Sequence, residues 1–251
     1  MKNNEKLTDR VGQVFETRQG YNATIIEYKN SRSCKVLFSD GNTVDNVIYT
    51  RLTQGGLKNP YHRTLYNIGY LGEDRRLRGQ DYLIYKSWAN MLKRCYNEKC
   101  LQSEPTYRDV TVCEEWHNYQ VFAEWHKNNY NFDTMKGWQL DKDILVKGNK
   151  IYSPQTCAFV PREVNITFTD NKSKTKIYPR GVTKRNNRFT ARTRDINGKN
   201  VMYRFDTPEE AFQSYKKVRE ERIKFMADKW KDLIDPRVYE ALYNYKVEIT
   251  D

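Results

Sequence analysis

The sequence has few histidines, no long apolar run and no internal repeat. Only three His occur in 251 residues, and none lies after His126. No apolar stretch approaches the roughly 18 residues that a membrane-spanning helix needs. The first ten residues, MKNNEKLTDR, contain no apolar core of a signal peptide. We therefore expect neither a membrane partner nor a secreted protein.

The cysteines also lack a pattern. Their number is odd, no CxxC pair is present, and they occupy the five positions Cys34, Cys95, Cys100, Cys113 and Cys157. Disulfide frameworks use an even number of cysteines at regular spacings, so we expect reduced thiols and a cytoplasmic protein. The last four thiols would suffice for a Cys₄ zinc site. Without a CxxC pair, their spacing favours buried structural thiols over structural zinc.

What the sequence does have is basic charge, and one segment holds most of it. The net charge is +12 and the isoelectric point is near 9.3. Residues 171–204 contain eleven Lys or Arg and a single acid, Asp195, a net of +10. A solvated basic face is the ordinary explanation of such a run, but this concentration favours nucleic acid as the partner.

Length and patterning predict a multidomain α+β protein. Residues 1–60 carry short apolar runs separated by turn signals such as Asp40-Gly41, which predicts a small closed β-barrel of the Tudor or Src-homology kind. Such a barrel either docks a partner or only spaces the other modules, and both interpretations stay open. Residues 61–80 have the composition of a linker.

The central segment, residues 81–170, predicts helices followed by a ββα unit. Apolar residues at three- and four-residue steps indicate helices over about 81–96 and 114–129. Then come an apolar run ending in two acids, a Gly148-Asn149 turn, a second apolar run and Pro161, which can open a helix. This order predicts strand, turn, strand and helix.

The last segment, residues 171–251, predicts three strands and a helix. Asn186-Asn187 and Asn197-Gly198 mark two tight turns, and Thr207 followed by Pro208 marks a helix start. Because side chains alternate along a strand, Arg188, Thr190, Arg192 and Arg194 share one face of the middle strand. We expect Arg180 and Lys184 to flank them and the Arg row to contact DNA in the major groove.

A resemblance supports this prediction. The segment contains the runs Tyr178-Pro179-Arg180-Gly181-Val182, Arg188-Phe189-Thr190-Ala191-Arg192 and Phe205-Asp206-Thr207-Pro208-Glu209-Glu210-Ala211 with Tyr215. It resembles the plant ethylene-response-factor DNA-binding domain, versions of which occur in phage and mobile-element nucleases; Phe189 stands where that family usually has Trp. The resemblance covers about 50 residues. It implies double-stranded DNA as the partner, contacted by Arg180, Arg185, Arg188, Arg192 and Arg194.

The central segment resembles phage-encoded HNH-type endonucleases in a degenerate form. The resemblance rests on the runs Trp88-Ala89-Asn90-Met91, Val112-Cys113-Glu114-Glu115-Trp116, Leu140-Asp141-Lys142-Asp143, Gly148-Asn149-Lys150-Ile151-Tyr152-Ser153-Pro154 and Thr156-Cys157. In that ββα-metal family, an acid and a further ligand hold Mg²⁺ on the scissile phosphate while a His activates water. The resemblance therefore implies a Mg²⁺- or Mn²⁺-dependent phosphodiester hydrolase in a phage's host-cell cytoplasm.

Carried over by position, the family's roles fall on a short set of residues. Asp141 and Asn165 are expected metal ligands, and Asp143 is a further candidate because it projects to the same side of a strand as Asp141. Lys142 takes the position of the general-base His, and Asn149 or Asn165 takes that of the family's middle Asn. An ordinary Lys, with a pKa near 10.4, is a poor base at neutral pH, so Lys142 alternatively clamps the phosphate.

Three functions stay open on the sequence alone. The leading hypothesis is a metal-dependent DNA endonuclease in which Lys142, Asp143 and Asn149 belong to the catalytic site. The alternative is a catalytically inactive DNA-binding regulator, or an inhibitor of a host nucleic-acid-dependent defence complex, with a host or phage protein bound through the N-terminal barrel. An RNA-binding module is the third, less favoured because the three-strand sheet lacks paired stacking aromatics.

Overall fold

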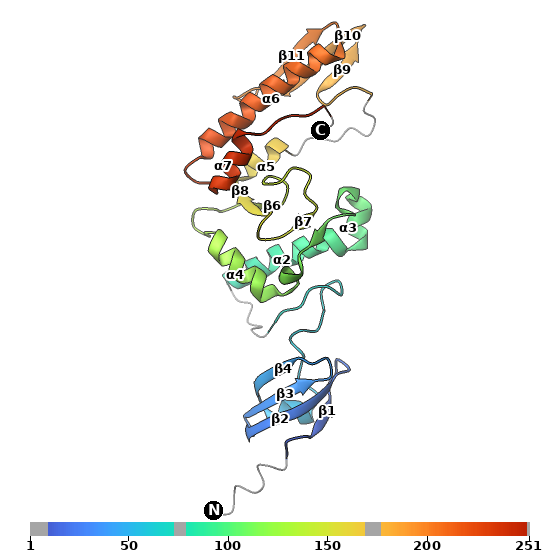
Figure 1. The fold of residues 1–251 in the computed structure, drawn as a ribbon, viewed down its shortest axis with the longest axis vertical. Helices are drawn as coiled ribbons and strands as arrows, with labels where there is room; N and C mark the ends of the chain where they lie inside the picture. Colours follow the sequence, from blue (N-terminus) through green and yellow to red (C-terminus); the bar gives the residue numbers. More distant parts are fainter. Residues whose placement is uncertain (1–9, 73–78, 169–176, 250–251) are drawn as a thin grey trace, which may run out of the picture. The chain divides into compact units, whose positions relative to one another are not determined.

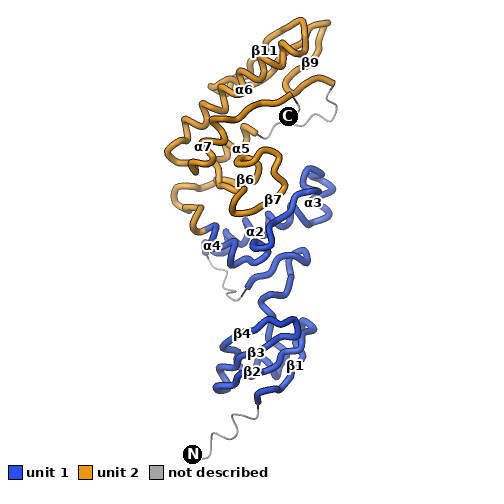
Figure 2. The backbone as a smooth tube through the Cα atoms, in the orientation of Figure 1, with its two compact units in different colours: residues 1–126 blue, residues 127–251 orange. Residues whose placement is uncertain are grey.

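The structure, a computed structural model, describes residues 10–72, 79–168 and 177–249 and has a mixed α+β architecture (Figure 1). The chain divides into two compact units, residues 1–126 and residues 127–251 (Figure 2). None of the helices within the described ranges combines the length and the apolar character that a membrane crossing requires.

The N-terminal module is an antiparallel sheet in the order β1-β2-β3-β4. Its strands are β1 (Val14–Glu16), β2 (Asn22–Asn30), β3 (Ser33–Phe38) and β4 (Thr43–Val47). The alternate buried positions of β2 and β3 form its core together with Leu52 of the short helix α1 (Tyr49–Thr53). The Asp40-Gly41 signal is confirmed as the turn between β3 and β4, where Gly41 has φ 87°.

The small β module is confirmed, but its sheet is not closed into the predicted barrel within the described residues, because β1 and β4 do not pair. Strand β1 has only three residues, and β4 leads almost directly into α1. After β1, the backbone bonds to the turn that follows α1, with Arg18 N donating to Gly55 O over 3.2 Å. The backbone that follows β1 is therefore bonded to the turn after α1, and the sheet is not closed.

The second half of unit 1 is helical, around a core of aromatic rings. It contains α2 (Gln80–Tyr96), α3 (Glu98–Ser103), the 3₁₀ turns Pro105–Tyr107 and Glu114–His117, β5 (Thr111–Val112) and, as far as His126, α4 (Tyr119–Asn129). The fully buried Trp88 donates its indole N–H to Trp116 O over 2.7 Å. The first predicted helix is confirmed. The second begins five residues later than predicted, because a 3₁₀ turn occupies the predicted start.

Unit 2 begins with a ββα arrangement. Its elements are β6 (Gln139–Asp141), β7 (Ile151–Tyr152), β8 (Ala158–Val160) and α5 (Arg162–Phe168). Strands β6 and β8 pair antiparallel, with Gln139 opposite Val160 and Asp141 opposite Ala158. The predicted helix after Pro161 is confirmed, and the second strand of the predicted hairpin is the run Ala158–Val160.

A three-stranded sheet and a long helix complete unit 2, as predicted. The sheet has the order β11-β10-β9 and consists of β9 (Val182–Arg185), β10 (Arg188–Arg194) and β11 (Asn200–Phe205). Helix α6 (Pro208–Trp230) starts with a capping box between Thr207 and Glu210 and is followed by α7 (Pro236–Tyr243). Figure 1 shows α6 lying along one face of the sheet.

Helix α6 belongs to two cores. Its first half packs Ala211, Phe212 and Tyr215 against Ala191 and Val182 of the sheet. Its second half packs Ile223, Met226 and Ala227 against β8, α5 and α7. One rigid helix therefore ties the sheet to the ββα elements within unit 2.

A close approach requires the glycine in the Arg180-Gly181-Val182 run. Gly181 has φ +76°, and a Cβ built at this position would overlap the Tyr215 ring. A side chain here would push α6 away from the sheet. The glycine thus fixes how closely helix and sheet pack.

Candidate nucleic-acid interface and ββα turn

The C-terminal sheet has one face covered by α6 and one face open. In β10, Phe189 and Ala191 join the core against α6, while Arg188, Arg192 and Arg194 are exposed. The alternation that the sequence predicts is therefore confirmed for these residues. We call the face opposite α6 the outer face.

The strand register shows which side chains share the outer face. Thr190 in β10 lies opposite Thr183 in β9 and Arg204 in β11, Arg188 lies opposite Arg185, and Arg192 lies opposite Met202. Side chains at directly paired positions point to the same side of a sheet. The arginines of the outer face are therefore Arg185, Arg188, Arg192, Arg194 and Arg204.

Arg204 and Met202 are the outer-face residues that the sequence reasoning missed. Both are exposed, Met202 to 61%. The alternation of the run Asn200–Phe205 put them on one face, but only the register of β11 against β10 shows that this face is the outer one. Counting from the Asn197-Gly198 turn, which fixes that register, could have identified them.

Two of the expected DNA contacts do not join this face. Lys184 is paired with Phe189, a residue of the helix-facing side, and its ammonium lies over the Phe189 ring at 5.5 Å. Arg180 precedes β9 and lines a cavity together with Tyr215 and Arg219 of α6. Both residues were expected to flank the Arg row from the first strand, but the strand alternation places Lys184 on the other side and Arg180 lies before β9.

The outer-face arginines have little charge compensation within the chain. Arg188 pairs with the exposed Asp206, with Nη2 3.0 Å from Oδ1, and such an exposed pair stabilises the fold by no more than about 1 kcal/mol. Within the described part of the chain, no ion pair involves the other members, Arg185, Arg192, Arg194 and Arg204. Their guanidinium groups are presented to solvent.

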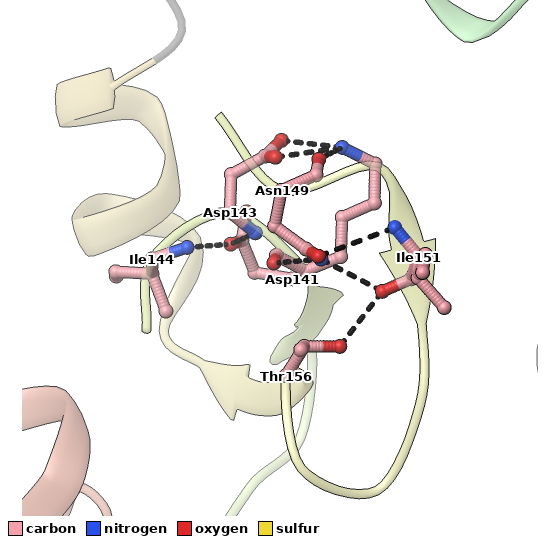
Figure 3. A network of polar contacts seen from close by, with 7 residues as sticks. Asp141, Asp143, Ile144, Asn149, Ile151 and Thr156 are labelled. Atoms are coloured by element: carbon pink, nitrogen blue, oxygen red, sulfur yellow. Dashed lines mark hydrogen bonds and ion pairs between the residues drawn. The ribbon is translucent and has the colours of Figure 1, made fainter. Parts of the chain in front are cut away.

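The turn after β6 is the second candidate site, and its polar groups bond mainly to one another (Figure 3). Asp141 Oδ1 accepts hydrogen bonds from the backbone N–H of Asp143 over 2.8 Å and of Ile144 over 2.7 Å. Burial raises the pKa of Asp141, and these two hydrogen bonds offset the effect only in part. One oxygen of the expected metal ligand therefore holds the turn.

Lys142 is fixed in the same turn. Its buried ammonium donates to both oxygens of Asp143, over 2.7 and 2.8 Å, and to Asn149 O over 3.0 Å. These bonds direct the ammonium into the turn. The carboxylate of Asp143 thus faces Lys142 and is not directed with Asp141 towards a common ligand.

Asn149 closes the loop between β6 and β7. Its amide donates to Lys142 O over 2.8 Å and to Ile151 O over 2.7 Å, and Thr156 Oγ1 also donates to Ile151 O over 2.7 Å. Side-chain amides that bond to nearby backbone are typical turn stabilisers. The expected catalytic residues Lys142, Asp143 and Asn149 are brought together, as parts of a turn.

Asn165 lies on α5 beside the start of β6, where its amide donates to Gln139 Oε1 over 2.5 Å. Because Gln139 and Asp141 are two residues apart on a strand, they project to one side. Asn165 and Asp141 are thus on the same side of the ββα arrangement, with Gln139, which the sequence reasoning missed, as their link. No group of three or more His, Cys, Asp or Glu that could hold a metal occurs within the described residues.

The histidines and thiols have structural surroundings. His117 Nε2 lies 3.2 Å from Val112 O, and burial lowers its pKa. His126 is buried and its ring lies 5.9 Å from that of Phe122. All five cysteines are free thiols; Cys34, Cys95 and Cys157 are buried, whereas Cys100 and Cys113 are half-buried, so burial is found for only two of the last four thiols.

Comparison of the chain with family models, with curated proteins and with solved structures finds no match. The two family resemblances therefore rest on the quoted residue runs alone.

Proposed function

We propose that the chain binds double-stranded DNA through the outer face of the β9–β11 sheet. The observation that carries the proposal is the row of exposed arginines on that face, four of which lack an ion-pair partner among the described residues. A protein surface usually intersperses both signs of charge. Here a concentrated positive face is held rigidly by α6 behind it.

The shape and chemistry of the face suit the DNA major groove. That groove is wide enough to admit strands, and an arginine fork can bond to two acceptors of a guanine or to a phosphate. Arg188 and Arg192 are four residues apart on β10, so they rise on the same side about 13 Å from one another. Arg185 and Arg204, on the flanking strands, widen the face towards phosphates on either side.

The proposal is tested by measuring duplex binding of the variant Arg188→Gln/Arg204→Gln. Both substituted arginines lie on the outer face. Fluorescence anisotropy with a 20-base-pair duplex should show affinity at least tenfold weaker than that of the unmodified chain. A matched control removes two exposed lysines elsewhere, Lys86→Gln/Lys217→Gln, and should lose less than threefold. Equal losses in the two variants would mean that only total charge matters and would reject the outer face as the docking surface.

A metal-dependent DNA endonuclease is the second candidate, favoured by one observation: Asp141 and Asn165 lie on the same side of β6 and α5. Mg²⁺ often takes only one or two protein oxygens and completes its shell with water and phosphate, so this small donor set fits it, with Asp143 turned away. Bound there, the metal would stabilise charge on a phosphate. Lys142 would act by holding the turn.

Asp141→Asn separates cutting from binding, because an amide oxygen can still accept the N–H groups of Asp143 and Ile144. Supercoiled DNA is incubated with each protein in Mg²⁺ or Mn²⁺. Metal-dependent nicking that disappears in Asp141→Asn, with duplex affinity retained, would support the endonuclease. Binding without nicking in either metal would leave the regulator or inhibitor as the function.

A further inference from the structure

The centre of the outer face alternates arginine with side chains that carry methyl groups. Thr190 of β10 lies opposite Arg204 of β11, and Arg192 of β10 lies opposite Met202 of β11. Residues two apart on a strand point to the same side, so these four side chains are neighbours on one face. The two arginines lie on one diagonal of the group, and Thr190 and Met202 lie on the other. The centre of the face is therefore not uniformly basic.

Thr190 and Met202 differ in how far a partner can reach them. Thr190 is only 8% exposed, although α6 packs against the opposite face of the sheet, so its neighbours on the outer face cover it. Met202, on the edge strand β11, remains 61% exposed. Of the two side chains, Met202 is therefore the one that presents apolar surface to a partner.

A single exposed apolar side chain is common on protein surfaces, but the position of Met202 sets it apart. Its paired neighbour is Arg192, and Arg204 lies two residues further along β11. The Cβ atoms of a directly paired set are about 5 Å apart, and same-side positions along a strand are about 7 Å apart. Met202 thus contacts the same part of a ligand as the two guanidinium groups.

The ligand that suits this group has an apolar atom beside arginine acceptors. Arginine binding to phosphate gains nothing from a methionine next to it, because phosphate offers no apolar surface. The major groove of DNA offers both groups, since guanine presents two acceptors to an arginine fork and thymine presents its 5-methyl group. The unbranched, flexible methionine side chain can adjust to the position of such a methyl group.

We propose that Met202 contacts the 5-methyl group of thymine, and that the outer face prefers duplexes in which thymine lies one or two base pairs from guanine. Base pairs follow one another at about 3.4 Å along the duplex axis, so side-chain separations of about 5 to 7 Å span one or two steps. Arg192 and Arg204 bind the guanine. Met202 is then a residue that determines sequence preference.

This inference rests on the proposed DNA binding and adds a base preference to it. Contacts to phosphate hold every sequence equally, whereas contacts to base edges discriminate between sequences. Burying one methyl group changes an affinity about fourfold. The preference should therefore be modest, and it should be separable from the larger loss that follows removal of arginines.

The test uses two 20-base-pair duplexes that differ only in 5-methyl groups. In the first duplex one strand repeats guanine–thymine and the other repeats adenine–cytosine, and in the second duplex uracil replaces every thymine. The repeat presents the same pattern in every register. Fluorescence anisotropy of the full unmodified chain should show affinity about fourfold higher for the thymine duplex. The variant Met202→Gln, similar in size but polar, should bind the two duplexes equally.

Two further variants serve as controls, after circular dichroism and thermal unfolding have shown that every variant is folded. Met202→Leu keeps an apolar side chain and should retain a preference of about twofold or more for the thymine duplex. Leu233→Gln removes a side chain that is 60% exposed and lies after α6, away from the sheet. It should retain the full preference.

Each outcome has a distinct consequence. Equal affinity of the unmodified chain for the two duplexes would overturn this inference and keep the proposed function. A preference that survives in Met202→Gln would overturn the role of Met202, because another group would then read the methyl. Failure of the unmodified chain to bind either duplex would reject the proposed function and this inference with it.

Discussion

The charged groups of the turn after β6 are bonded within the fold, whereas those on the outer face of the C-terminal sheet are exposed to solvent. In the turn, Lys142 donates to Asp143 and Asn149, and Asp141 accepts from two backbone N–H groups. On the outer face, Arg185, Arg192 and Arg204 extend into solvent without an ion-pair partner among the described residues. Groups that bond to their own fold stabilise it, whereas groups presented to solvent are available to a partner.

The comparison predicts that the turn and the outer face respond to substitution in different measurements. Changes in the turn should alter the free energy of unfolding and leave DNA affinity nearly constant. Changes on the outer face should do the reverse.

The largest loss of stability should follow Asn149→Ala. The substitution removes a donor to Lys142 O and one of two donors to Ile151 O, which keeps its bond from Thr156 Oγ1, and a buried carbonyl that loses its donor costs about 1–3 kcal/mol before solvent reaches it. We expect the free energy of unfolding in urea to fall by about 2–3 kcal/mol, with the duplex affinity of the folded chain unchanged. Asn128→Ala, at an exposed position of α4, is the control and should not lose stability.

The next effect concerns the ion pair of the turn. Asp143→Ala removes two acceptors of the buried Lys142 ammonium and keeps its bond to Asn149 O, and we expect a loss of about 1–2 kcal/mol, reduced because Asp143 is half exposed. The double substitution Lys142→Met/Asp143→Ala also removes the buried charge that has lost these acceptors and should recover most of the loss. A double variant less stable than Asp143→Ala would show that Lys142 stabilises the fold by more than its ion pair with Asp143.

A smaller effect should appear as a pH dependence at Asp141. Because burial raises its pKa in the folded state, the folded chain holds a proton that the unfolded chain, with a pKa near 3.8–3.9, has released. This group's contribution to stability is therefore present below the unfolded pKa and is lost as pH rises through the folded pKa. In Asp141→Asn the contribution is absent, so its free energy of unfolding relative to the unmodified chain should increase between pH 3.5 and 7. A constant difference across that range would contradict the assignment.

The smallest effect on stability should come from the outer face. Arg192→Gln removes an exposed side chain that has no ion-pair partner in the described ranges, so the free energy of unfolding should change by less than about 0.5 kcal/mol. Duplex affinity should nevertheless fall severalfold. A stability loss above about 1 kcal/mol would show that Arg192 is needed by the fold and would weaken the contrast with the turn.

Much of unit 2 was predictable because local signals agree with the tertiary structure. The turns at Asn186-Asn187 and Asn197-Gly198 and the cap at Thr207 set the strands and the start of α6. Alternation then placed Arg188 and Arg192 correctly. Arg204 was missed because its face depends on the register between strands, which no single strand's pattern reveals.

The candidate sites were less predictable because a sequence motif identifies residues but not the groups to which their side chains bond. Asp141, Lys142 and Asp143 stand in the positions of a metal site, yet the local turn orients Asp143 towards Lys142. Closure of the N-terminal sheet was hard to predict for a related reason, since it depends on the edge pairing of β1 and β4, which are distant in sequence and do not pair in the described residues. The cavity that Arg180 lines combines α5, α6 and the sheet, so no local pattern could predict it.

A two-dimensional ¹H–¹⁵N NMR titration of the full chain with a 20-base-pair duplex tests the central claim most directly, because it observes the turn and the outer face in the same sample. We predict that the Nε–Hε signals of Arg185, Arg188, Arg192 and Arg204 and the backbone amides of β9–β11 shift on binding. The chemical shifts of the backbone amides of residues 141–151 should not change. Shifts concentrated in residues 141–151, with the arginine signals unchanged, would contradict the account.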